Sequence, residues 1–108
     1  MERGRRTHRL KYIHELHQFG YSVYTFDHRC QGLSGRAVPG HHQRVHVDDF
    51  RWYVDDMLTF VDNHVPKHHT SDGNRLTILA HSMGGMVASL ATLRRPELFR
   101  ALVLCAPM

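Results

Sequence analysis

The sequence predicts an α/β fold with a mostly parallel sheet and crossover helices. Two short apolar runs, residues 76–80 and 101–106, lack polar alternation, which is typical of strands buried on both faces of a parallel sheet. A helical stretch separates the two runs, and helices alternate with strands along the chain. Such alternation favours parallel strands joined by right-handed crossovers. We therefore expect three strands and three helices within the 108 residues.

The first predicted helix leads directly into the first predicted strand. Apolar residues recur in it at helical spacing, at Leu10, Ile13, Leu16 and Phe19. Gly20 follows at a position where helices are commonly capped. Residues 21–26 are rich in aromatic and β-branched side chains, and they predict a strand that ends at Asp27.

A long loop and a second helix come next. Residues 29–43 contain glycines and a proline without an apolar period, which predicts the longest loop of the chain. Asp48 is suited to cap the helix that follows, and Pro66 ends that helix. The apolar face of this helix consists of Phe50, Tyr53, Val54, Met57, Leu58, Val61 and Val65. A polar connector, residues 67–75, leads to the apolar run at 76–80.

The segment AHSMGG, residues 80–85, lies between the strand 76–80 and a helix over residues 83–95 that Pro96 closes. It matches the pattern G-x-S-x-G of a nucleophile elbow, with alanine in place of the first glycine. In such an elbow a serine protrudes from a sharp, strained strand-to-helix turn, so the residues two positions away must be small. Ser82 is therefore the predicted nucleophile, and its elbow is formed by Ala80, His81, Gly84 and Gly85.

The helix after Ser82 predicts how negative charge on a substrate is stabilised. The first backbone N–H groups of a helix have no acceptor within it, and here they point toward the reaction centre. The Met83 amide is placed to donate a hydrogen bond to a developing oxyanion, and removal of one such donor typically costs about 3 to 4 kcal/mol. The alternative is a serine in a tight turn without catalytic role. The flanking strand and helix favour the elbow.

Four stretches of the chain carry a resemblance to a known family. In order and spacing, the chain resembles the bacterial lysophospholipases of the monoacylglycerol-lipase-like group of α/β-hydrolases in the stretches YTFDHRCQGLSGR, VDDFRWYVDD and LTILAHSMGG. It is similar to the same group in RPELFRALVLCAPM, from the end of the elbow helix through the next strand. The resemblance covers nearly the whole chain. It implies a partial α/β-hydrolase fold, with residues 1–108 as a fragment of one domain that carries the elbow.

The resemblance also implies an activity. It makes Ser82 the nucleophile and the Met83 amide one oxyanion donor, and alanine at position 80 is similar to the lysophospholipase branch. The implied reaction is hydrolysis of a lysophospholipid, a monoacylglycerol or a related small ester through an acyl-enzyme, without a cofactor. Related families cleave N-terminal residues from peptides, so a serine aminopeptidase is an alternative label.

The catalytic triad is incomplete in this chain. α/β-Hydrolases present serine, acid and histidine in that order, but residues 83–108 contain no histidine and no aspartate. Glu97 is their only acid, and it precedes the place where the family carries its acid; His81 is held by the turn. The second oxyanion donor of the family follows a strand that precedes this chain's first helix. We therefore expect an internal fragment of a longer enzyme, or a truncated gene product, with little activity of its own.

An alternative from another class is a catalytically inactive hydrolase-like module that binds a lipid or a partner. The genomic sequence beyond Met108 separates the two hypotheses: an aspartate and then a histidine in frame support the enzyme, and a stop codon supports the module. Cys30 is a second departure, because the family pattern carries glycine there. We interpret Cys30 as a residue that the loop tolerates; the alternative is a reactive thiol beside the site.

The composition and net charge of the chain indicate which classes of partner it binds. Apolar residues make up 42% of the chain and charged residues 22%, as in globular proteins. Much of the formal charge of +4 comes from the opening stretch, at Arg3, Arg5, Arg6, Arg9 and Lys11. This charge favours contact with an anionic membrane, besides the lipid or ester substrate. Nucleic acid is not expected, because no recognition-helix pattern accompanies the charge.

The apolar segments and cysteines predict a compartment. No apolar stretch follows the charged first residues, and no run reaches the length of a membrane span. Two cysteines, Cys30 and Cys105, are too few for a disulfide framework, and we expect both to be free thiols in a reducing compartment. These features predict a cytoplasmic protein that is at most peripheral to a membrane.

Eleven histidines invite a metal hypothesis, which the spacing does not favour. Zinc needs three or four convergent ligands. Pro66 breaks the helix between His64 and His68, and no third ligand accompanies His14 and His17. The adjacent pairs, His41 with His42 and His68 with His69, are interpreted as loop and surface residues. We expect no metal site.

The resemblance leaves the first strand without the neighbour that separates it from the second in the family. That strand either pairs directly with the second strand or stays apart and exposes unpaired backbone groups and apolar side chains. We expect residues 76–80 to lie parallel to residues 101–105, with the helix over 50–65 covering one face of the sheet. The isolated chain is therefore predicted to be marginally stable.

Overall fold

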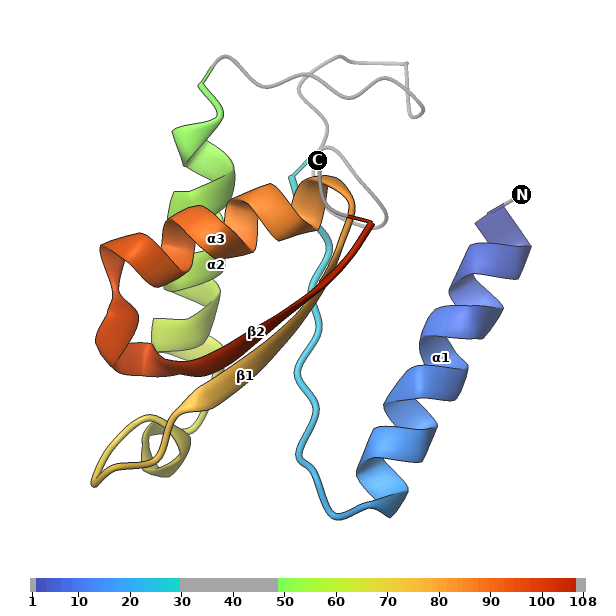
Figure 1. The fold of residues 1–108 in the computed structure, drawn as a ribbon, viewed down its shortest axis with the longest axis horizontal. Helices are drawn as coiled ribbons and strands as arrows, with labels where there is room; N and C mark the ends of the chain where they lie inside the picture. The colour runs from blue at the N-terminus through green and yellow to red at the C-terminus, as the bar shows by residue number, and fades with distance from the viewer. Residues whose placement is uncertain (1, 30–48, 107–108) are drawn as a thin grey trace.

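The computed structural model describes residues 2–29 and 49–106, which form three α-helices, two short 3-10 helices and one two-stranded sheet (Figure 1). In chain order the elements are α1 (Glu2–Gln18), α2 (Arg51–His64), η1 (Lys67–His69), β1 (Leu76–His81), α3 (Met83–Arg94), η2 (Pro96–Leu98) and β2 (Phe99–Cys105). Helix α3 packs against both strands and against α2, whereas α1 stands to one side (Figure 1). The predicted α/β class is confirmed, with two strands in place of three.

The two strands are parallel neighbours. Thr77 lies opposite Ala101 and Ala80 opposite Leu104, so the predicted pairing of residues 76–80 with 101–105 is confirmed. Parallel strands need a crossover connection, and α3 provides it. Strand β2 begins at Phe99, two residues earlier than predicted. The carboxyl ends of the strands meet where His81 pairs with Cys105.

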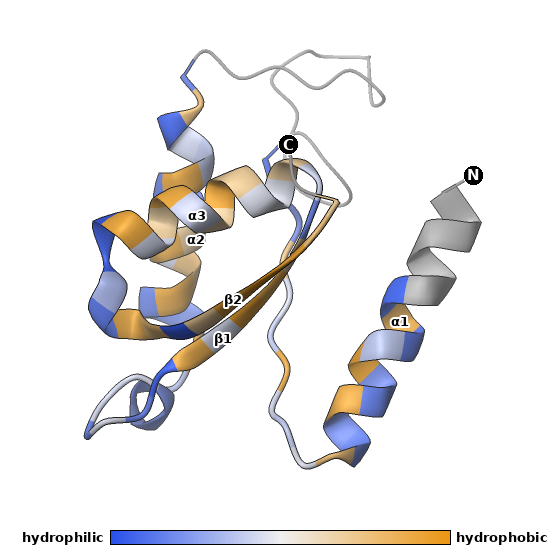
Figure 2. Ribbon diagram, viewed as in Figure 1, coloured by the Kyte–Doolittle hydropathy of each residue, from blue (hydrophilic) through white to orange (hydrophobic). Residues whose placement is uncertain are grey.

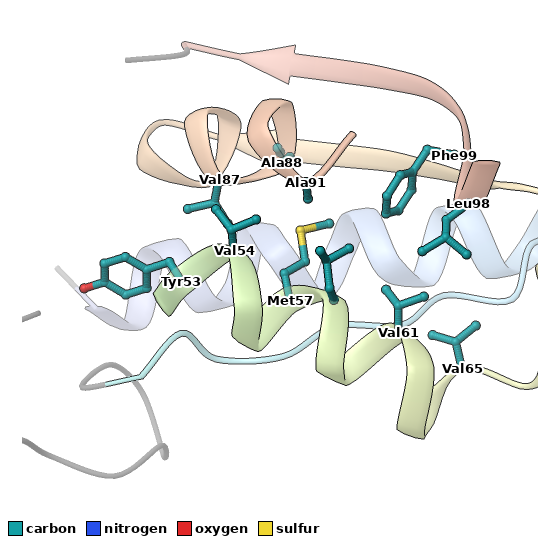
Figure 3. Packing of buried hydrophobic residues seen from close by; sticks show 12 residues of the cluster. Tyr53, Val54, Met57, Val61, Val65, Val87, Ala88, Ala91, Leu98 and Phe99 are labelled. Carbon is teal, nitrogen blue, oxygen red and sulfur yellow. The ribbon is translucent and has the colours of Figure 1, made fainter. Parts of the chain in front are cut away.

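One face of the sheet carries the hydrophobic core. The buried residues are Tyr53, Val54, Met57, Leu58, Val61, Val65, Ala80, Val87, Ala88, Ala91, Leu98 and Phe99. In Figure 3 the side chains of Val54 and Met57 on α2 point toward the small residues of α3. Ala88 and Ala91 are at most 1% exposed, and their small size lets the two helices approach closely. The buried residues of α2 are those of the predicted apolar face, and they join the strand residues Ala80 and Phe99 in one core.

Helix α2 begins and ends close to the predicted boundaries. Phe50 is its N-cap residue and makes no side-chain capping bond, while Asp48, the predicted cap, lies outside the described residues. The carboxylate of Asp49 instead accepts a hydrogen bond from the Arg51 backbone N–H at 2.9 Å. This bond satisfies one of the free donors of the first turn. At the other end Val65 is extended, as expected for a residue before proline.

The second face of the sheet is open, which corrects the prediction of strands buried on both faces. Leu79 is 53% exposed and Val103 48% exposed, although both strands are largely apolar (Figure 2). Residues 76, 78 and 80 of β1 are directed to the core and alternate with exposed ones. An apolar run therefore shows that a strand has two apolar faces. It does not show whether an element of the same chain covers the second one.

Helix α1 is longer than predicted and is not packed as an amphipathic helix. It begins at Glu2 rather than near residue 9, and two of its predicted core residues, Leu10 and Phe19, are 60% and 83% exposed. Its C-terminus agrees with the prediction. Gly20 has a φ of 94° and donates to the carbonyl of His17, and the Tyr21 N–H donates to the carbonyl of Leu16. These two bonds form a Schellman motif.

The predicted strand over residues 21–26 is absent from the described part of the fold. The segment 21–28 is extended but is not assigned to the sheet, which consists of β1 and β2. Tyr21 is 63% exposed, whereas Phe26 stacks on Phe60 of α2 at 4.8 Å between ring centroids. Aromatic and β-branched residues favour extended backbone, but a strand also needs a hydrogen-bonding neighbour. The segment stays apart from the sheet, which was one of the two predicted outcomes.

The predicted loop over residues 29–43 is described only at Arg29. Cys30 and the His41–His42 pair, about which the sequence raised a thiol and a metal hypothesis, lie outside the described residues. Among the residues that are described, no three His, Cys, Asp or Glu side chains gather in a metal-binding arrangement. Within the same residues, no helix is both long and apolar enough to cross a membrane.

The one-sided core predicts how the chain responds to leucine truncation. Leu58 is 7% exposed and Leu79 is 53% exposed, so they form a matched pair on the two sides of the fold. Leu58→Ala is expected to cost about 2 to 5 kcal/mol, enough to unfold most of a marginal domain. Leu79→Ala is expected to change the free energy of unfolding by only about 0.5 kcal/mol. Urea denaturation followed by circular dichroism measures both, and the unmodified chain should unfold at low urea.

Two results would contradict this prediction. The first is a sharp transition of the monomeric unmodified chain at high urea, because it excludes marginal stability. The second is equal destabilisation by the two substitutions, because it requires that the Leu79 face be covered in solution.

Candidate active site

Ser82 occupies the turn between β1 and α3 as the N-cap residue of α3. Its φ of 54° and ψ of −123° lie in a region that residues other than glycine rarely adopt. The Gly85 N–H donates a hydrogen bond of 2.9 Å to the Ser82 carbonyl, which starts the helix. Ser82 is half-buried. The predicted strand-to-helix turn with unusual backbone geometry is confirmed, while the catalytic role of Ser82 stays a prediction.

The end of the sheet holds this turn in place. The Ser82 N–H donates to the carbonyl of Cys105 at 3.0 Å, so the strained residue is bonded directly to the last residue of β2. A strained backbone of this kind costs on the order of 1 to 3 kcal/mol and persists only where surrounding contacts determine it. The turn lies at the carboxyl ends of parallel strands, the edge at which open α/β sheets bind their ligands.

Small residues surround the turn, as the elbow pattern requires. Ala80 is 8% exposed, and Gly85 is buried in the first turn of α3. A Cβ atom added at Gly84 would lie 3.8 Å from Nε2 of His28, which is an ordinary van der Waals distance. The position therefore has room for a methyl group.

Met83 is the first residue of α3, and its backbone N–H has no acceptor within the helix. The amide therefore lies next to Ser82 at the positive end of the helix dipole, where an anion is favoured. Its side chain packs against the hydrophobic core and ties the start of α3 to the sheet. The assignment of this amide as an oxyanion donor stays a prediction.

The acid and the neighbouring histidine considered in the sequence have other surroundings. Glu97 lies in η2, beyond the far end of α3, and accepts a 2.6 Å hydrogen bond from Nε of Arg95. This hydrogen bond lowers the pKa of Glu97, which is therefore charged and occupied with Arg95. His81 ends β1 with an exposed side chain. The structure thus brings Ser82, Met83 and the small elbow residues together, but not Glu97.

The sequence analysis did not single out His28, which lies beside the elbow. Its Nε2 is the atom nearest to the Cβ position of Gly84. Its ring meets Phe26 at 5.3 Å and Tyr53 of α2 at 5.5 Å, both edge to face. The Nδ1 atom is buried and has no hydrogen-bond partner in the described part of the chain. The sequence contained one signal for this residue: His28 belongs to the stretch DHR and immediately precedes Arg29. The structure shows that Arg29 is bonded to α2.

Arg29, the residue after His28, is bonded to helix α2. Its Nε and Nη2 atoms donate to the two carboxylate oxygens of Asp56 at 2.6 and 2.7 Å. The guanidinium group also lies 5.2 Å from the ring centre of Trp52. A bidentate arginine–carboxylate pair that also contacts an aromatic ring fixes geometry better than a single ion pair does. Arg29 therefore attaches the segment after Phe26 to α2.

The electrostatic surroundings of His28 favour its neutral form. Burial lowers the pKa of His28, and the charge of Arg9 lowers it further, while the carboxylates of Asp56 and Asp27 act in the opposite direction. Burial is the largest of these effects.

Cys105, whose carbonyl receives the Ser82 N–H, is a free and exposed thiol, as predicted for this cysteine.

A parallel β–α–β unit with a strained serine at the strand-to-helix turn defines the α/β-hydrolase class. The comparison with protein families agrees with this assignment. The family described as serine aminopeptidase, S33, matches residues 3–108, and the chain belongs to this family of hydrolases. Among curated proteins, the chain is similar to lysophospholipases and monoglyceride lipases. No solved structure matches the chain significantly.

Curated relatives support this grouping. The chain is 39% identical to lysophospholipase L2 of Escherichia coli K12 over 95 residues, which are 88% of this chain and 27% of the relative. It is 39% identical to a probable lysophospholipase L2 of Haemophilus influenzae over 80% of this chain and 26% of the relative. Human monoglyceride lipase is 35% identical over 80% of this chain and 25% of its own length. The chain thus spans about a quarter of the length of the relatives it matches.

The backbone strain at Ser82 predicts an order of stability among its variants. Glycine adopts a positive φ without the steric cost that any Cβ atom adds. Ser82→Gly is therefore expected to be more stable than Ser82→Ala by about 1 kcal/mol, after the greater freedom of glycine in the unfolded chain is included. Urea denaturation of the two variants measures the difference.

Ser71 provides the matched control. It is an exposed serine without a positive φ, so glycine should be no more stable there than alanine. If Ser82→Gly and Ser82→Ala unfold at the same urea concentration, the strained turn is not present in solution.

Proposed function

We propose that this chain carries the nucleophile of a carboxylic ester hydrolase and that Ser82 forms the acyl-enzyme. The observation that supports this most is the backbone of Ser82, with a φ of 54° between a strand and a helix N-terminus. With a ψ of −123° this backbone lies in a region that residues other than glycine rarely adopt, and such strain is concentrated at functional sites. In hydrolases this geometry presents the hydroxyl group to the substrate beside free backbone N–H donors.

The proposed reaction proceeds in two steps. The Ser82 hydroxyl oxygen attacks the ester carbonyl carbon while its proton passes to a base, and the carbonyl oxygen becomes an oxyanion that accepts a hydrogen bond from the Met83 N–H. Collapse of this tetrahedral intermediate expels the alcohol, which takes up the proton, and leaves the acyl group on Ser82. Water then attacks the acyl-enzyme with the help of the same base and releases the carboxylic acid.

The base is proposed to come from sequence outside these residues. In α/β-hydrolases the acid and the histidine follow the serine, and residues 83–108 contain neither aspartate nor histidine. The relatives are about four times as long as the matched segment, which leaves room for both. In this proposal His28 and His81 are not the base, since both precede Ser82 in the chain.

The proposed substrate is a lipid ester. The relatives are named lysophospholipase and monoglyceride lipase, and both names describe hydrolysis of an ester of a fatty acid and a glycerol derivative. The family description names an aminopeptidase, but the sequence is matched by ester hydrolases over 80% or more of the chain. The basic stretch at the start of the chain supports contact with anionic lipid, as a cytoplasmic protein peripheral to the membrane.

The 108-residue chain by itself is expected to turn over esters very slowly. It supplies the nucleophile and one oxyanion donor without a base, and enzymes that lose triad members keep only a small fraction of their rate. Hydrolysis of a short-chain chromogenic ester should therefore lie orders of magnitude below that of an intact serine esterase assayed in parallel. Ser82→Ala should remove the remaining rate above background.

A comparison of two substrates tests the proposed substrate class, and the rate of the 108-residue chain tests the proposed origin of the base. Extension of the chain by the sequence that follows Met108 should restore hydrolysis of a lysophospholipid but not of an amino-acid anilide, if the substrate is a lipid ester. Fast turnover by the 108 residues alone, abolished by Ser82→Ala, would show that the base lies within them.

A further inference from the structure

The imidazole of His28 links three parts of the fold. His28 ends the extended segment 21–28, its ring contacts Tyr53 of α2, and its Nε2 lies 3.8 Å from the place that a Cβ atom of Gly84 would take in the first turn of α3. Residues 28 and 84 are far apart in sequence, so their approach is a product of tertiary packing. A Cβ atom at position 84 would lie in ordinary van der Waals contact with the ring, so the two groups are close neighbours.

The ring is held in place from the α2 side. Arg29, the next residue, is bonded through two hydrogen bonds to Asp56, and Asp56 lies three residues after Tyr53 on the same face of α2. Tyr53 is 1% exposed, so its ring is a fixed surface against which His28 rests. Phe26 also contacts the imidazole, at 5.3 Å between ring centroids. The His28 side chain therefore lies against two aromatic rings and close to the first turn of α3.

We propose that His28 is a positioning residue of the nucleophile elbow, whose uncharged imidazole sets the place of the first turn of α3 and thereby of the Met83 amide beside Ser82. The importance of this positioning for catalysis rests on the proposed function of Ser82. The positioning itself is a property of the fold and is measured without a substrate.

The uncharged state is part of this role. The buried Nδ1 has no partner among the described residues, so a proton added there would remain without an acceptor. The first turn of α3 carries no titratable side chain and presents only the positive end of its dipole to the ring. Arg9 from α1 also disfavours the imidazolium, while Asp56 of α2 and the adjacent Asp27 favour it.

These effects predict the direction of the pH dependence. Burial lowers the pKa of folded His28, so the unfolded chain takes up the proton more readily than the folded one. The stabilisation from the neutral ring is therefore complete at pH above the ordinary histidine range. It is lost as the pH falls through that range toward the lowered pKa, and the first turn of α3 should change its position over this interval.

Nuclear magnetic resonance of the 108-residue chain tests the proposal. The amide signals of Met83 and Gly84 and the ring signal of His28 are followed from neutral to acidic pH. The expected result is a shift of both amide signals with the same midpoint as the His28 ring, below the ordinary histidine range. Backbone signals near the C-terminal end of α3 should shift several-fold less.

Four variants separate positioning from general stability. His28→Ala should displace the Met83 and Gly84 signals at neutral pH several-fold more than those of Thr92 and Leu93, and His28→Phe should keep their positions but abolish their titration. His14→Ala should change neither signal. His81→Ala should preserve the titration, which excludes the histidine nearest in sequence as its cause.

Several results would overturn the proposal. These are elbow signals unchanged in His28→Ala, changes spread evenly over the chain, or an acid titration that persists in His28→Phe. If His28→Ala does not fold, the proposal is tested by the titration of the Met83 and Gly84 signals in the unmodified chain and by the loss of that titration in His28→Phe. Ser82→Ala should leave the His28 titration intact, so failure of the ester assay and failure of the positioning proposal are distinguishable.

Discussion

The close contact between α2 and α3 is the interaction on which the rest of this structure depends. Val54 and Val87 are fully buried where the two helices meet, and Ala88 and Ala91 allow the backbones to approach. The sheet is attached to this pair through Ala80 and Phe99, which belong to the same core. The extended segment that carries His28 and Arg29 is attached to it through Tyr53 and Asp56. Both sides of the elbow are therefore positioned by one helix pair.

The packing of α2, α3 and the sheet forms a framework that offsets the backbone strain at Ser82. Ser82 adopts a positive φ, which costs free energy, and its N–H is held by the last residue of β2. The helix that starts behind it is packed into the core through Val87, Ala88 and Ala91. A fixed serine next to a free amide is the arrangement that electrostatic stabilisation of an oxyanion requires, because donors that are already in place need no reorganisation. The core packing of α2 and α3 thus holds in place the groups that the proposed chemistry uses.

The same framework is one-sided, which agrees with the short match to the relatives. Leu79 and Val103 form an apolar surface on the face of the sheet away from α2 and α3, and α1 stands apart with Leu10 and Tyr12 exposed. The chain spans about a quarter of the relatives' length, and Glu97, the only acid after Ser82 in the sequence, is bonded to Arg95 beyond the far end of α3. The turn around Ser82 is thus present in the described residues, while residues that complete the triad are proposed to lie outside this sequence.

The sequence by itself determined the elements whose signals are local. Small residues on both sides of Ser82 between an apolar run and a helical stretch predicted the elbow, and the apolar period of α2 predicted its buried face, because turn geometry and helical periodicity depend on neighbouring residues. Tertiary structure decided what depends on distant partners. Residues 21–26 have strand propensity but no strand in the described sheet, since backbone pairing needs a neighbour that propensity cannot supply. The approach of His28 to Gly84 was likewise invisible in the sequence, because it arises only when α2 anchors Arg29 and α3 packs on α2.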